Sequence, residues 1–290
     1  MKKYKTSFFL ALFSIPIAAL FISTLLPYFV SQAIGGLSSK DESSVILNLA
    51  LATIIGIVGT ALNLVGFQML TRHEGSVRAS LSDATFKQVI EKDVRFFVNE
   101  KVGALTSRFI DFIRSQVTLQ DLLIIRTLGF VLSVGVGLII VAIQSLLLAL
   151  IVIVLLTGLI VQVRWSIKKR APWRHERKKI SGAIHGDIAD AVTNNLIVKT
   201  FAGEKREIGT IAKQNMRFKE IFLKDIGFIA YEGSARVFIM VLAQIIVISL
   251  CSYLILQKQI ELAVAVFAIA YLQQIASQIF TLGDILNGYD

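Results

Sequence analysis

Few polar side chains of this sequence lie where they could take part in chemistry, and the first candidates flank an apolar stretch. Glu232 and Arg236 stand four residues apart, so on a helix they share one face. Ionisable groups beside a membrane are candidates for function, here a polar patch that selects a ligand. The plainer alternative is an ion pair at a helix end, which contributes roughly 0.2–0.5 kcal/mol. We expect the plainer alternative.

Uncharged amides in apolar surroundings form the second set of candidates. The set comprises Gln68, Gln162, Gln244, Gln273, Gln274 and Gln278. The four from Gln244 onward, with Glu232 and Arg236, could line a path through a membrane, or the amides could hydrogen-bond between helices. Small residues four apart, at Gly56 and Thr60 and at Ser133 and Gly137, indicate close helix contacts rather than chemistry.

Other kinds of chemistry find no pattern in the sequence. The histidines give no metal site, because His185 and Asp187, two residues apart, point to different faces of a helix. The phosphate-binding pattern G-x(4)-G-K-[ST] is missing, since its nearest look-alike, "GEKREIGT" from Gly203, lacks the Gly-Lys-Ser/Thr end. We therefore expect no metal, cofactor or catalytic residue in this chain, and we expect Cys251 to be a buried small apolar residue.

The composition is that of a membrane protein. Of 290 residues, 55% are hydrophobic and only 17% are charged, and the mean hydropathy is +0.71. Soluble domains contain about 25% charged residues. The net charge of +10 does not indicate nucleic-acid binding, because the basic residues flank the apolar stretches, as in the cytoplasmic loops of membrane proteins.

Six apolar stretches are long enough to cross the hydrocarbon core, which takes roughly 20 helical residues. The predicted spans are residues 8–30, 45–70, 122–143, 145–163, 226–256 and 262–285. The third and fourth spans meet in a tight hairpin next to Gln144. The predicted fold class is all-α: six transmembrane helices with two long cytoplasmic helical hairpins, at about residues 71–121 and 164–225.

The distribution of lysine and arginine orients the chain. Segment 71–121 holds eight and segment 164–225 holds fifteen, whereas the loops on the other side hold only Lys40 and Lys258. Both termini and both long segments are therefore predicted to be cytoplasmic. The first span resembles a secretory signal in its lysine-rich start, but it is longer than a signal and no cleavage site follows, so we expect it to stay.

Each cytoplasmic segment has the pattern of a helical hairpin. No proline or turn cluster interrupts residues 45–97, so span two is predicted to continue as one helix of roughly 80 Å, of which about 30 Å lies in the membrane. The chain is then predicted to break at Gly103 and return to span three. The second segment repeats this plan, with "NNLIVKTFAG" at its tip.

Both tips are expected to expose apolar side chains to water. They are Phe96, Phe97, Val102 and Leu105 at the first tip, and Leu196, Ile197, Val198 and Phe201 at the second. A solvated helical bundle without a function would not gather such residues at the ends of long hairpins. The pattern therefore favours docking of another protein at the tips.

The tips also carry the residues of a known pattern. The stretch "DVRFFVNEKVGALTSRFID" from Asp93 resembles the first intracellular loop of ABC exporters, which reads approximately D-x-x-F-F, a short polar gap, then T/V-G-x-L-x-S-R and an acidic residue. The stretch from Asp190 through "NNLIVKTFAGEKRE" is similar to the second loop of that family, with Asp190 in place of the usual Glu. With the six spans, the resemblance covers nearly the whole chain.

The resemblance implies that residues 1–290 are the transmembrane domain of a type I ABC exporter, which works as a homo- or heterodimer. It implies that both tips are coupling helices that sit in grooves of partner nucleotide-binding domains, which would bind ATP and Mg. The residues assigned to these contacts are Phe96, Phe97, Val102, Gly103, Leu105, Ser107, Arg108, Asp111, Asp190, Asn195, Leu196, Ile197, Val198, Lys199, Phe201, Gly203 and Glu204. ATP-driven closure of those domains would shift the populations of inward- and outward-facing states.

Two features depart from the family pattern. The stretch "SLCSYLILQKQIELAVAV" between spans five and six lacks the usual glycines, which puts close packing at the outer end of those helices in doubt. The sequence also stops at Asp290, where family members continue into the nucleotide-binding domain, so we expect that domain to be fused C-terminally in a longer protein.

The leading hypothesis is the membrane domain of an ATP-driven exporter. We expect a bacterial inner membrane, because the sequence shows no Arg- and Ser-rich transit segment. The alternative is a non-transporting scaffold or receptor whose cytoplasmic hairpins bind a signalling partner. A passive channel is a weaker third hypothesis, because no ring-forming charge motif is found.

Overall fold

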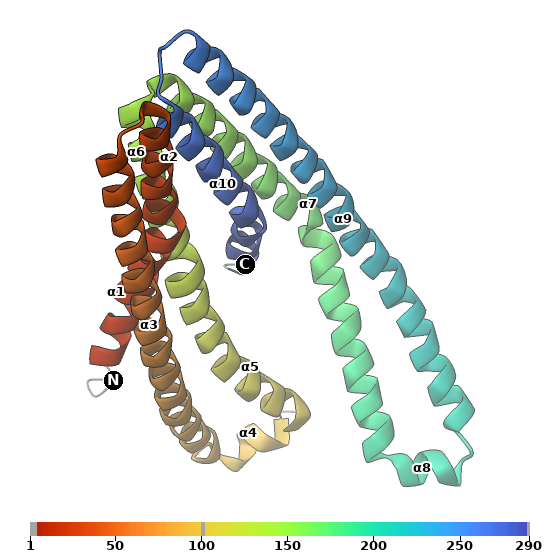
Figure 1. Ribbon diagram of the computed structural model, residues 1–290. Helices are drawn as coiled ribbons and strands as arrows, with labels where there is room; N and C mark the ends of the chain where they lie inside the picture. Colours follow the sequence, from red (N-terminus) through yellow and green to blue (C-terminus); the bar gives the residue numbers. More distant parts are fainter. Residues whose placement is uncertain (1–4, 100–101, 289–290) are drawn as a thin grey trace. The chain divides into compact units, whose positions relative to one another are not determined.

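The chain is helical throughout the part that the structure describes. The computed structural model describes residues 5–99 and 102–288, with side chains except at 98, 99, 102–104, 106, 107 and 279–288. No strand occurs among these residues (Figure 1). The predicted all-α class is confirmed.

Two compact units make up the fold, and each is described by itself. Unit 1 comprises residues 1–160 and 240–290, and unit 2 comprises residues 161–239. Two long helices, α7 (Leu146–Thr193) and α9 (Glu204–Leu256), contribute to both units.

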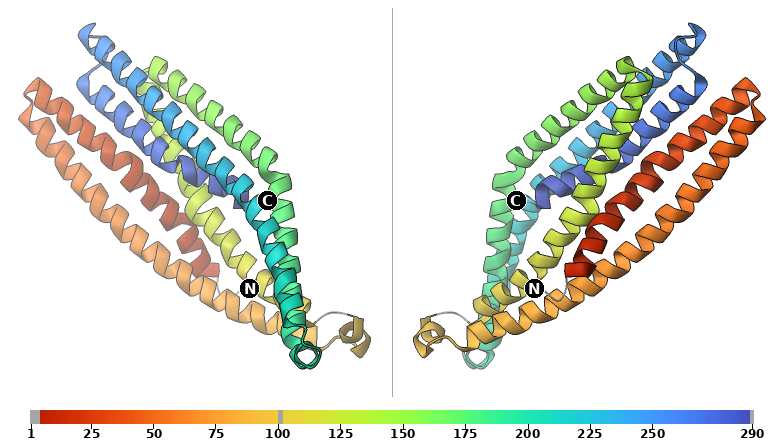
Figure 2. Two further views of the ribbon diagram at one scale, coloured as in Figure 1. Left: turned by 90° about the vertical axis from the view of Figure 1, so that its right-hand side faces the viewer. Right: turned by 90° about the vertical axis from the view of Figure 1, so that its left-hand side faces the viewer.

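Unit 1 begins with two antiparallel helical runs that lie side by side (Figure 2). The first run is continuous through α1 (Lys5–Leu20), the π-helical segment η2 (Phe21–Leu25) and α2 (Leu26–Ser39). Lys40 then takes a left-handed backbone with a φ of 60°. Asp41 begins the second run, α3 (Glu42–Ile90), and its carboxylate accepts the Ser44 N–H at 3.2 Å.

The tip of the first hairpin differs from the prediction. Helix α3 ends at Ile90 rather than Phe97, and a turn at 91–93 leads into the short helix α4 (Val94–Asn99). Asp93 is a residue type that favours a helix start, and its carbonyl accepts the Phe96 N–H at 2.9 Å. The predicted break at Gly103 is wrong, because this glycine lies in the first turn of α5 (Val102–Asp121).

The remaining helices of unit 1 include the tight hairpin that was predicted next to Gln144. Helix α5 continues into the π-helical segment η3 (Leu122–Leu128) and then α6 (Gly129–Gln144). Ser145 is extended, with φ of −157° and ψ of 108°, and it connects α6 to α7. After α9, Lys258 takes a φ of 56° in the turn that leads to α10 (Leu262–Gly288).

The core of unit 1 lies where α6, α7, α9 and α10 meet. Tyr271 of α10 is 1% exposed, and its O–H donates to the Val134 carbonyl at 2.5 Å. Its ring lies over Gly137 of α6, where an added Cβ would be 2.1 Å from a ring carbon. The close contact that the Ser133 and Gly137 spacing predicts is therefore confirmed.

A close approach at the start of α10 involves a glycine of α2. Gly35 of α2 lies against Ala263 at the start of α10, and an added Cβ would be 2.7 Å from the Ala263 side chain. Gly35, which lies beyond the end of the predicted first span, thus permits a close approach of α2 to α10.

Several helices have the length and composition to cross a membrane. Within the described residues these are Lys5–Ser39, Glu42–Ile90, Arg108–Gln144, Leu146–Thr193 and Glu204–Leu256, and the apolar helix Leu262–Gln278 is shorter. Large apolar side chains such as Ile46, Ile57 and Val154 are 65–70% exposed on these segments. Such a surface can contact lipid tails, which are as apolar as leucine side chains. Membrane-spanning helices are confirmed, and the count of six stays a prediction.

Unit 2 is a helical hairpin. Residues 161–193 of α7 and 204–239 of α9 run antiparallel, and the short helix α8 (Asn195–Thr200) joins them (Figure 1). Ile180 and Ile184 of α7 bury themselves against Ile221 of α9, with Trp173 and Phe218 packed beside them. This apolar contact holds the two helices together over the part of the hairpin nearer to α8.

Candidate functional site

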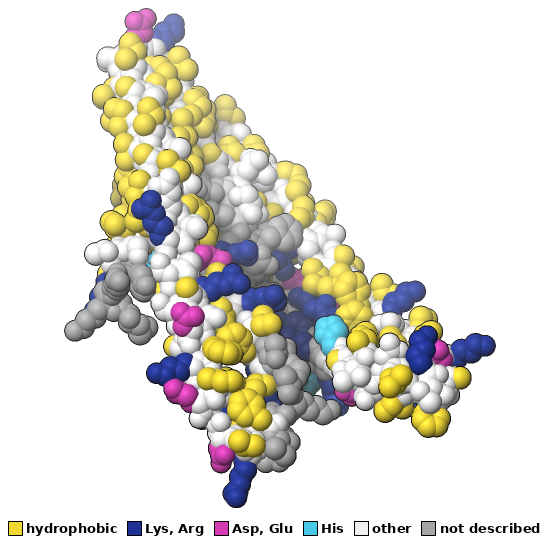
Figure 3. All heavy atoms as spheres, turned by 90° about the horizontal axis from the view of Figure 1, so that it is seen from below, with side chains coloured by type: hydrophobic (Ala, Val, Ile, Leu, Met, Phe, Trp, Pro, Cys, Tyr) yellow, Lys and Arg dark blue, Asp and Glu magenta, His cyan; other side chains and the backbone are white. Residues whose placement is uncertain are grey.

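The tip of unit 2 presents apolar side chains to its surroundings. Leu196 and Ile197 of α8 are 81% and 57% exposed, and Phe201 is 80% exposed. Val198, predicted to be exposed with them, is half-buried. Figure 3 shows hydrophobic side chains beside lysines and arginines at this end of unit 2. A helix of six residues cannot bury three such side chains by itself, so they form a surface that another protein could cover.

A left-handed cap sets the direction in which α8 ends. The Gly203 N–H donates to the Val198 carbonyl at 2.8 Å, and the Ala202 N–H donates to the Lys199 carbonyl at 3.2 Å. Ala202 itself has a φ of 49°. This is the Schellman arrangement, which satisfies the last carbonyls of a helix and turns the chain sharply.

Charged residues flank the α8 surface. Lys199 pairs with Glu204 at 3.1 Å. The backbone N–H of Glu204 donates to its own carboxylate and lowers the pKa of that carboxyl, and Lys199 lowers it further. On the other side of α8, the Asp190 carbonyl accepts both the backbone N–H and the side-chain amide of Asn194 at 2.9 Å. Asp190, Asn195 and Lys199 are exposed.

The first tip is less exposed than predicted. Phe96 and Phe97 of α4 are half-buried, and their rings meet edge to face at 5.4 Å. Each ring covers part of the other, which the sequence pattern cannot reveal. Leu105 is also half-buried, and Arg108 and Asp111 are exposed. The side chains of Val102, Gly103 and Ser107 lie outside the described part of the structure.

Glu232 and Arg236 form part of a buried network rather than an exposed pair. They are 5% and 7% exposed, and Arg236 donates to the Glu232 carboxylate. Ser166 of α7 also donates to Glu232, and the Gln162 amide donates to it at 2.8 Å. The Gln162 carbonyl accepts from Arg236 at 3.0 Å. The expected i,i+4 ion pair is present, but α7 covers it and satisfies both partners, so the pair is buried rather than exposed at a helix end.

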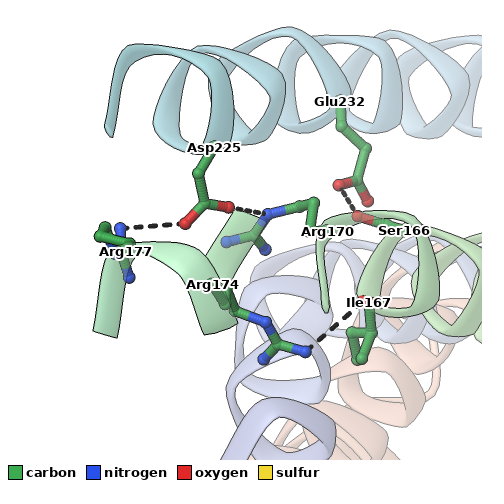
Figure 4. A network of polar contacts seen from close by, with 7 residues as sticks. All are labelled: Ser166, Ile167, Arg170, Arg174, Arg177, Asp225 and Glu232. Carbon is green, nitrogen blue, oxygen red and sulfur yellow. Dashed lines mark hydrogen bonds and ion pairs between the residues drawn. The ribbon is translucent and has the colours of Figure 1, made fainter. Parts of the chain in front are cut away.

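A second buried ion pair lies nearer to α8 (Figure 4). Asp225 of α9 is 0% exposed, and its carboxylate accepts from Arg170 at 2.8 Å and contacts Arg177 at 3.0 Å. Arg174, on the same helix, donates to the Ile167 carbonyl at 3.4 Å.

Sequence reasoning missed Asp225 and its arginines, although a signal was available. Arg170 and Asp225 lie equally far along the chain from the middle of α8, on helices that run antiparallel. Residues placed in this way on the two arms of a hairpin face one another. An acid and a base in that relation indicate an ion pair across the hairpin, provided that the position of the tip is known.

The glutamines of unit 1 are placed in two ways. Gln244 of α9 donates to Gln273 of α10 at 3.4 Å, so these two form an interhelical hydrogen bond. Gln274 and Gln278 each have a buried side-chain polar atom without a hydrogen-bond partner. Gln68 is exposed on α3.

Metal and thiol chemistry gain no support from the geometry. Among the described residues, no group of three or more His, Cys, Asp or Glu side chains is arranged to hold a metal ion. Cys251 is 1% exposed in the apolar core, as a structural rather than a reactive cysteine is.

Two comparisons with known proteins match nearly the whole of this chain. A family model described as "ABC transporter transmembrane region" matches residues 8–279. A solved structure of a bacterial Atm1-family ABC exporter with ATP bound is similar, with a TM-score of 0.76 and 18% sequence identity. The similarity covers 99% of this chain and 50% of that one, so the chain spans about half of that relative's length. No curated protein sequence matches the chain.

Proposed function

The chain belongs to the family of ABC transporter transmembrane regions, and from that premise we propose that it is the membrane part of an ATP-driven exporter. In this proposal its helices line the translocation path, and partner nucleotide-binding domains bind ATP and Mg. Two such membrane domains work together as a homo- or heterodimer in a bacterial inner membrane, with both termini cytoplasmic. The likeness to an exporter solved with ATP bound supports this proposal.

The observation that carries the proposal is the exposed apolar surface of α8 at the end of a tied hairpin. Leu196, Ile197 and Phe201 together form a compact apolar patch. Behind it, the Asp225 and Glu232 networks join α7 to α9. In this proposal, a patch that docks a partner, on a hairpin whose two helices are joined by these networks, transmits a displacement of that partner along the helices.

The coupling mechanism needs a difference in free energy between two states. ATP shifts the membrane domain only if the closed pair of nucleotide-binding domains binds one arrangement of the tips more tightly than the other. A shift from about 1:99 to 99:1 requires about a 10⁴-fold difference in affinity. Contacts at both tips, including Phe96 and Phe97 of α4, would supply that difference in this proposal.

The polar side chains proposed for the path differ in how well they suit it. Gln274 and Gln278 have buried polar atoms without a partner, so a solute could satisfy them. Gln244 and Gln273 satisfy one another. Glu232 and Arg236 are already paired with each other and with α7, so they are weaker candidates for contact with a solute.

Coupling through α8 is tested by Phe201→Asp in the full transporter, with its nucleotide-binding domains. We expect substrate-stimulated ATP hydrolysis to fall at least tenfold, because a central aromatic residue of an interface commonly contributes about 2 kcal/mol or more. Membrane insertion should not change, because Phe201 lies outside the predicted spans.

Met216→Asp is the matched control, because Met216 is 59% exposed on α9 but lies away from α8. It should keep stimulated hydrolysis within about twofold of the wild type. Equal stimulation in Phe201→Asp and the wild type would contradict coupling through α8. If the tips instead captured a partner without any nucleotide-binding domain, the scaffold alternative would be favoured.

A further inference from the structure

One cavity of unit 1 has no part in the proposed docking surfaces. It has a volume of about 780 Å³, and residues of α1, α3 and α5 line it. Five of its lining side chains are polar: Lys5, His73, Ser80, Gln116 and Gln120. The others are apolar: Phe8, Phe9, Val77, Leu81 and Ala84. The cavity therefore offers hydrogen-bonding groups within a partly apolar wall.

His73 supplies a buried hydrogen-bond donor to this cavity. It is 7% exposed, and the Phe8 ring lies against it with the ring centroids 5.1 Å apart. Its Nε2 atom lies 3.1 Å from the side-chain nitrogen of Gln120. An amide nitrogen only donates, so the His73 Nε2 atom accepts here, and a neutral His73 ring carries its proton on Nδ1. Within the described part of the chain, this Nδ1 atom has no hydrogen-bond partner.

Two amide oxygens of α5 supply acceptors. Gln116 Oε1 and Gln120 Oε1 are buried, and neither has a hydrogen-bond partner among the described residues. Polar atoms that are buried without partners destabilise a protein, so the cavity favours a ligand that accepts from His73 and donates to the two glutamines. Of the described side chains that line the cavity, Lys5 is positively charged and none is acidic. A ligand with hydroxyl groups and one negative charge fits this set.

The polar groups lie at the depth of lipid headgroups. Predicted spans one and three begin at residues 8 and 122, and span two ends at residue 70. Lys5, His73 and Gln120 are two or three residues outside these limits, which is about 5 Å or less along a helix. The headgroup region on each face of a bilayer is roughly 5–7 Å thick. The ligand is therefore expected to be a membrane lipid.

A second cavity, next to the first, has room for an acyl chain. Its volume is about 580 Å³, and Lys5 and Phe9 line both cavities. Its lining follows α1 through Phe13 and Ile17 and includes Leu62 of α3. These three residues belong to the predicted spans, and Phe13 is 61% exposed. An apolar cavity at the depth of the hydrocarbon thus meets a polar cavity at the depth of the headgroups.

We propose that the two cavities together bind one phosphatidylglycerol molecule. Its phosphate accepts from His73 Nδ1 and pairs with Lys5, as basic pockets between transmembrane helices do with acidic headgroups. Its glycerol hydroxyls donate to Gln116 and Gln120, and one acyl chain lies in the second cavity. The bound lipid holds α1 against α3 and α5 at the membrane surface. This site does not rest on the proposed exporter function.

The test compares three lipids with identical acyl chains, by native mass spectrometry of the purified full protein. Phosphatidylethanol has the phosphodiester charge of phosphatidylglycerol without its hydroxyls, and phosphatidylcholine has neither a hydroxyl nor a net charge. The first phosphatidylglycerol should bind with a Kd at least about fivefold lower than that of phosphatidylethanol, because the hydroxyls satisfy the buried amide oxygens. Phosphatidylcholine should be about another fivefold weaker, because the attraction of Lys5 is lost.

The recognition of the hydroxyls is tested by Gln116→Leu combined with Gln120→Leu. This double variant should bind phosphatidylglycerol and phosphatidylethanol with equal Kd. Gln68→Leu is the matched control, since Gln68 is exposed on α3 and lines neither cavity. It should keep the wild-type preference. A preference that survives in the double variant overturns the proposal.

The recognition of the charge is tested by Lys5→Gln, which should raise the Kd for phosphatidylglycerol about fivefold. Arg72→Gln is the matched control, because Arg72 precedes His73 on α3 and lines neither cavity. Its Kd should stay within about twofold of the wild type. Equal losses in the two variants would indicate a general attraction of lipid to the basic surface and would overturn the proposal.

The wild type alone also decides, should a variant fail to fold. Equal Kd values for phosphatidylglycerol and phosphatidylethanol overturn the proposal without any substitution. Glycerol phosphate, which has the same head without acyl chains, should not displace the lipid at equal concentration. Displacement by it would show that the second cavity contributes nothing and would overturn the assignment to a lipid.

Discussion

Replacement of Asp225 by alanine should open the second hairpin by a large and local amount. The carboxylate is fully buried and contacts Arg170 and Arg177 across the hairpin. Removal of one partner from a buried ion pair leaves the other charge uncompensated, which typically costs about 3–5 kcal/mol. The Arg177 side chain is 28% exposed and can turn toward water, whereas that of Arg170 is 8% exposed and cannot. We therefore expect the lower end of the range, about 3 kcal/mol.

The natural assay is amide hydrogen exchange, resolved by mass spectrometry on peptides that cover residues 166–178 and 220–232. A loss of about 3 kcal/mol corresponds to roughly a hundredfold faster opening-limited exchange there. Exchange in the core around Tyr271 should not change, because that core belongs to unit 1.

Glu176→Ala is the matched control in the same hairpin. Glu176 pairs with Arg217 at 3.0 Å, but both side chains are exposed, at 37% and 67%. Such a pair contributes about 0–1 kcal/mol, so exchange should rise by at most about fivefold. The double variant Asp225→Leu with Arg170→Leu should recover most of the loss, because it removes the buried charge as well as its partner. Equal effects of Asp225→Ala and Glu176→Ala would refute the assignment of the Asp225 network as the element that holds the hairpin closed.

Two further predictions concern backbone and packing. Gly137→Ala should lower the melting temperature of the purified protein by several degrees. Its Cβ would lie 2.1 Å from the buried Tyr271 ring, and overpacking costs about 1–3 kcal/mol. The control Gly135→Ala, on the same helix, should not lower the melting temperature, because its Cβ meets nothing within 4 Å. Ala202→Gly should stabilise unit 2 by about 0.5 kcal/mol, since a left-handed conformation disfavours alanine. The control is Ala212→Gly, inside α9, which should lower the stability of unit 2 by about 1 kcal/mol. A loss of stability in both variants would show that Ala202 is not strained.

The elements of this fold were predictable because they follow from hydropathy and charge. Apolar stretches of the length of a membrane, separated by basic segments with a helical pattern, specify long helices that continue beyond the apolar stretches. The turn at Ser145 and the position of α8 follow from the same patterns. These features depend on local sequence, and tertiary contacts do not change them.

Features that depend on the register between helices were not predictable in the same way. The burial of Glu232 results from contacts across a hairpin. The end of α3 at Ile90 and the contact between the Phe96 and Phe97 rings were not predicted from the sequence either. The π-helical segments η2 and η3 also escaped prediction. Thr24 of η2 donates to the Ser133 carbonyl at 3.1 Å, a contact between residues more than a hundred positions apart, and no local pattern announces it.

The two hairpins share a design that differs in the sign of one charge. In each, an aspartate stands directly before a predicted span, Asp121 before Leu122 and Asp225 before Ile226. Asp225 meets arginines on the opposite helix, so its contact is attractive wherever the carboxylate is ionised. Asp121, by contrast, lies near another acid, Glu74 of α3. If the tip of the second hairpin docks on a nucleotide-binding domain, the attraction between Asp225 and its arginines should keep the two helices together while they transmit the movement of that domain.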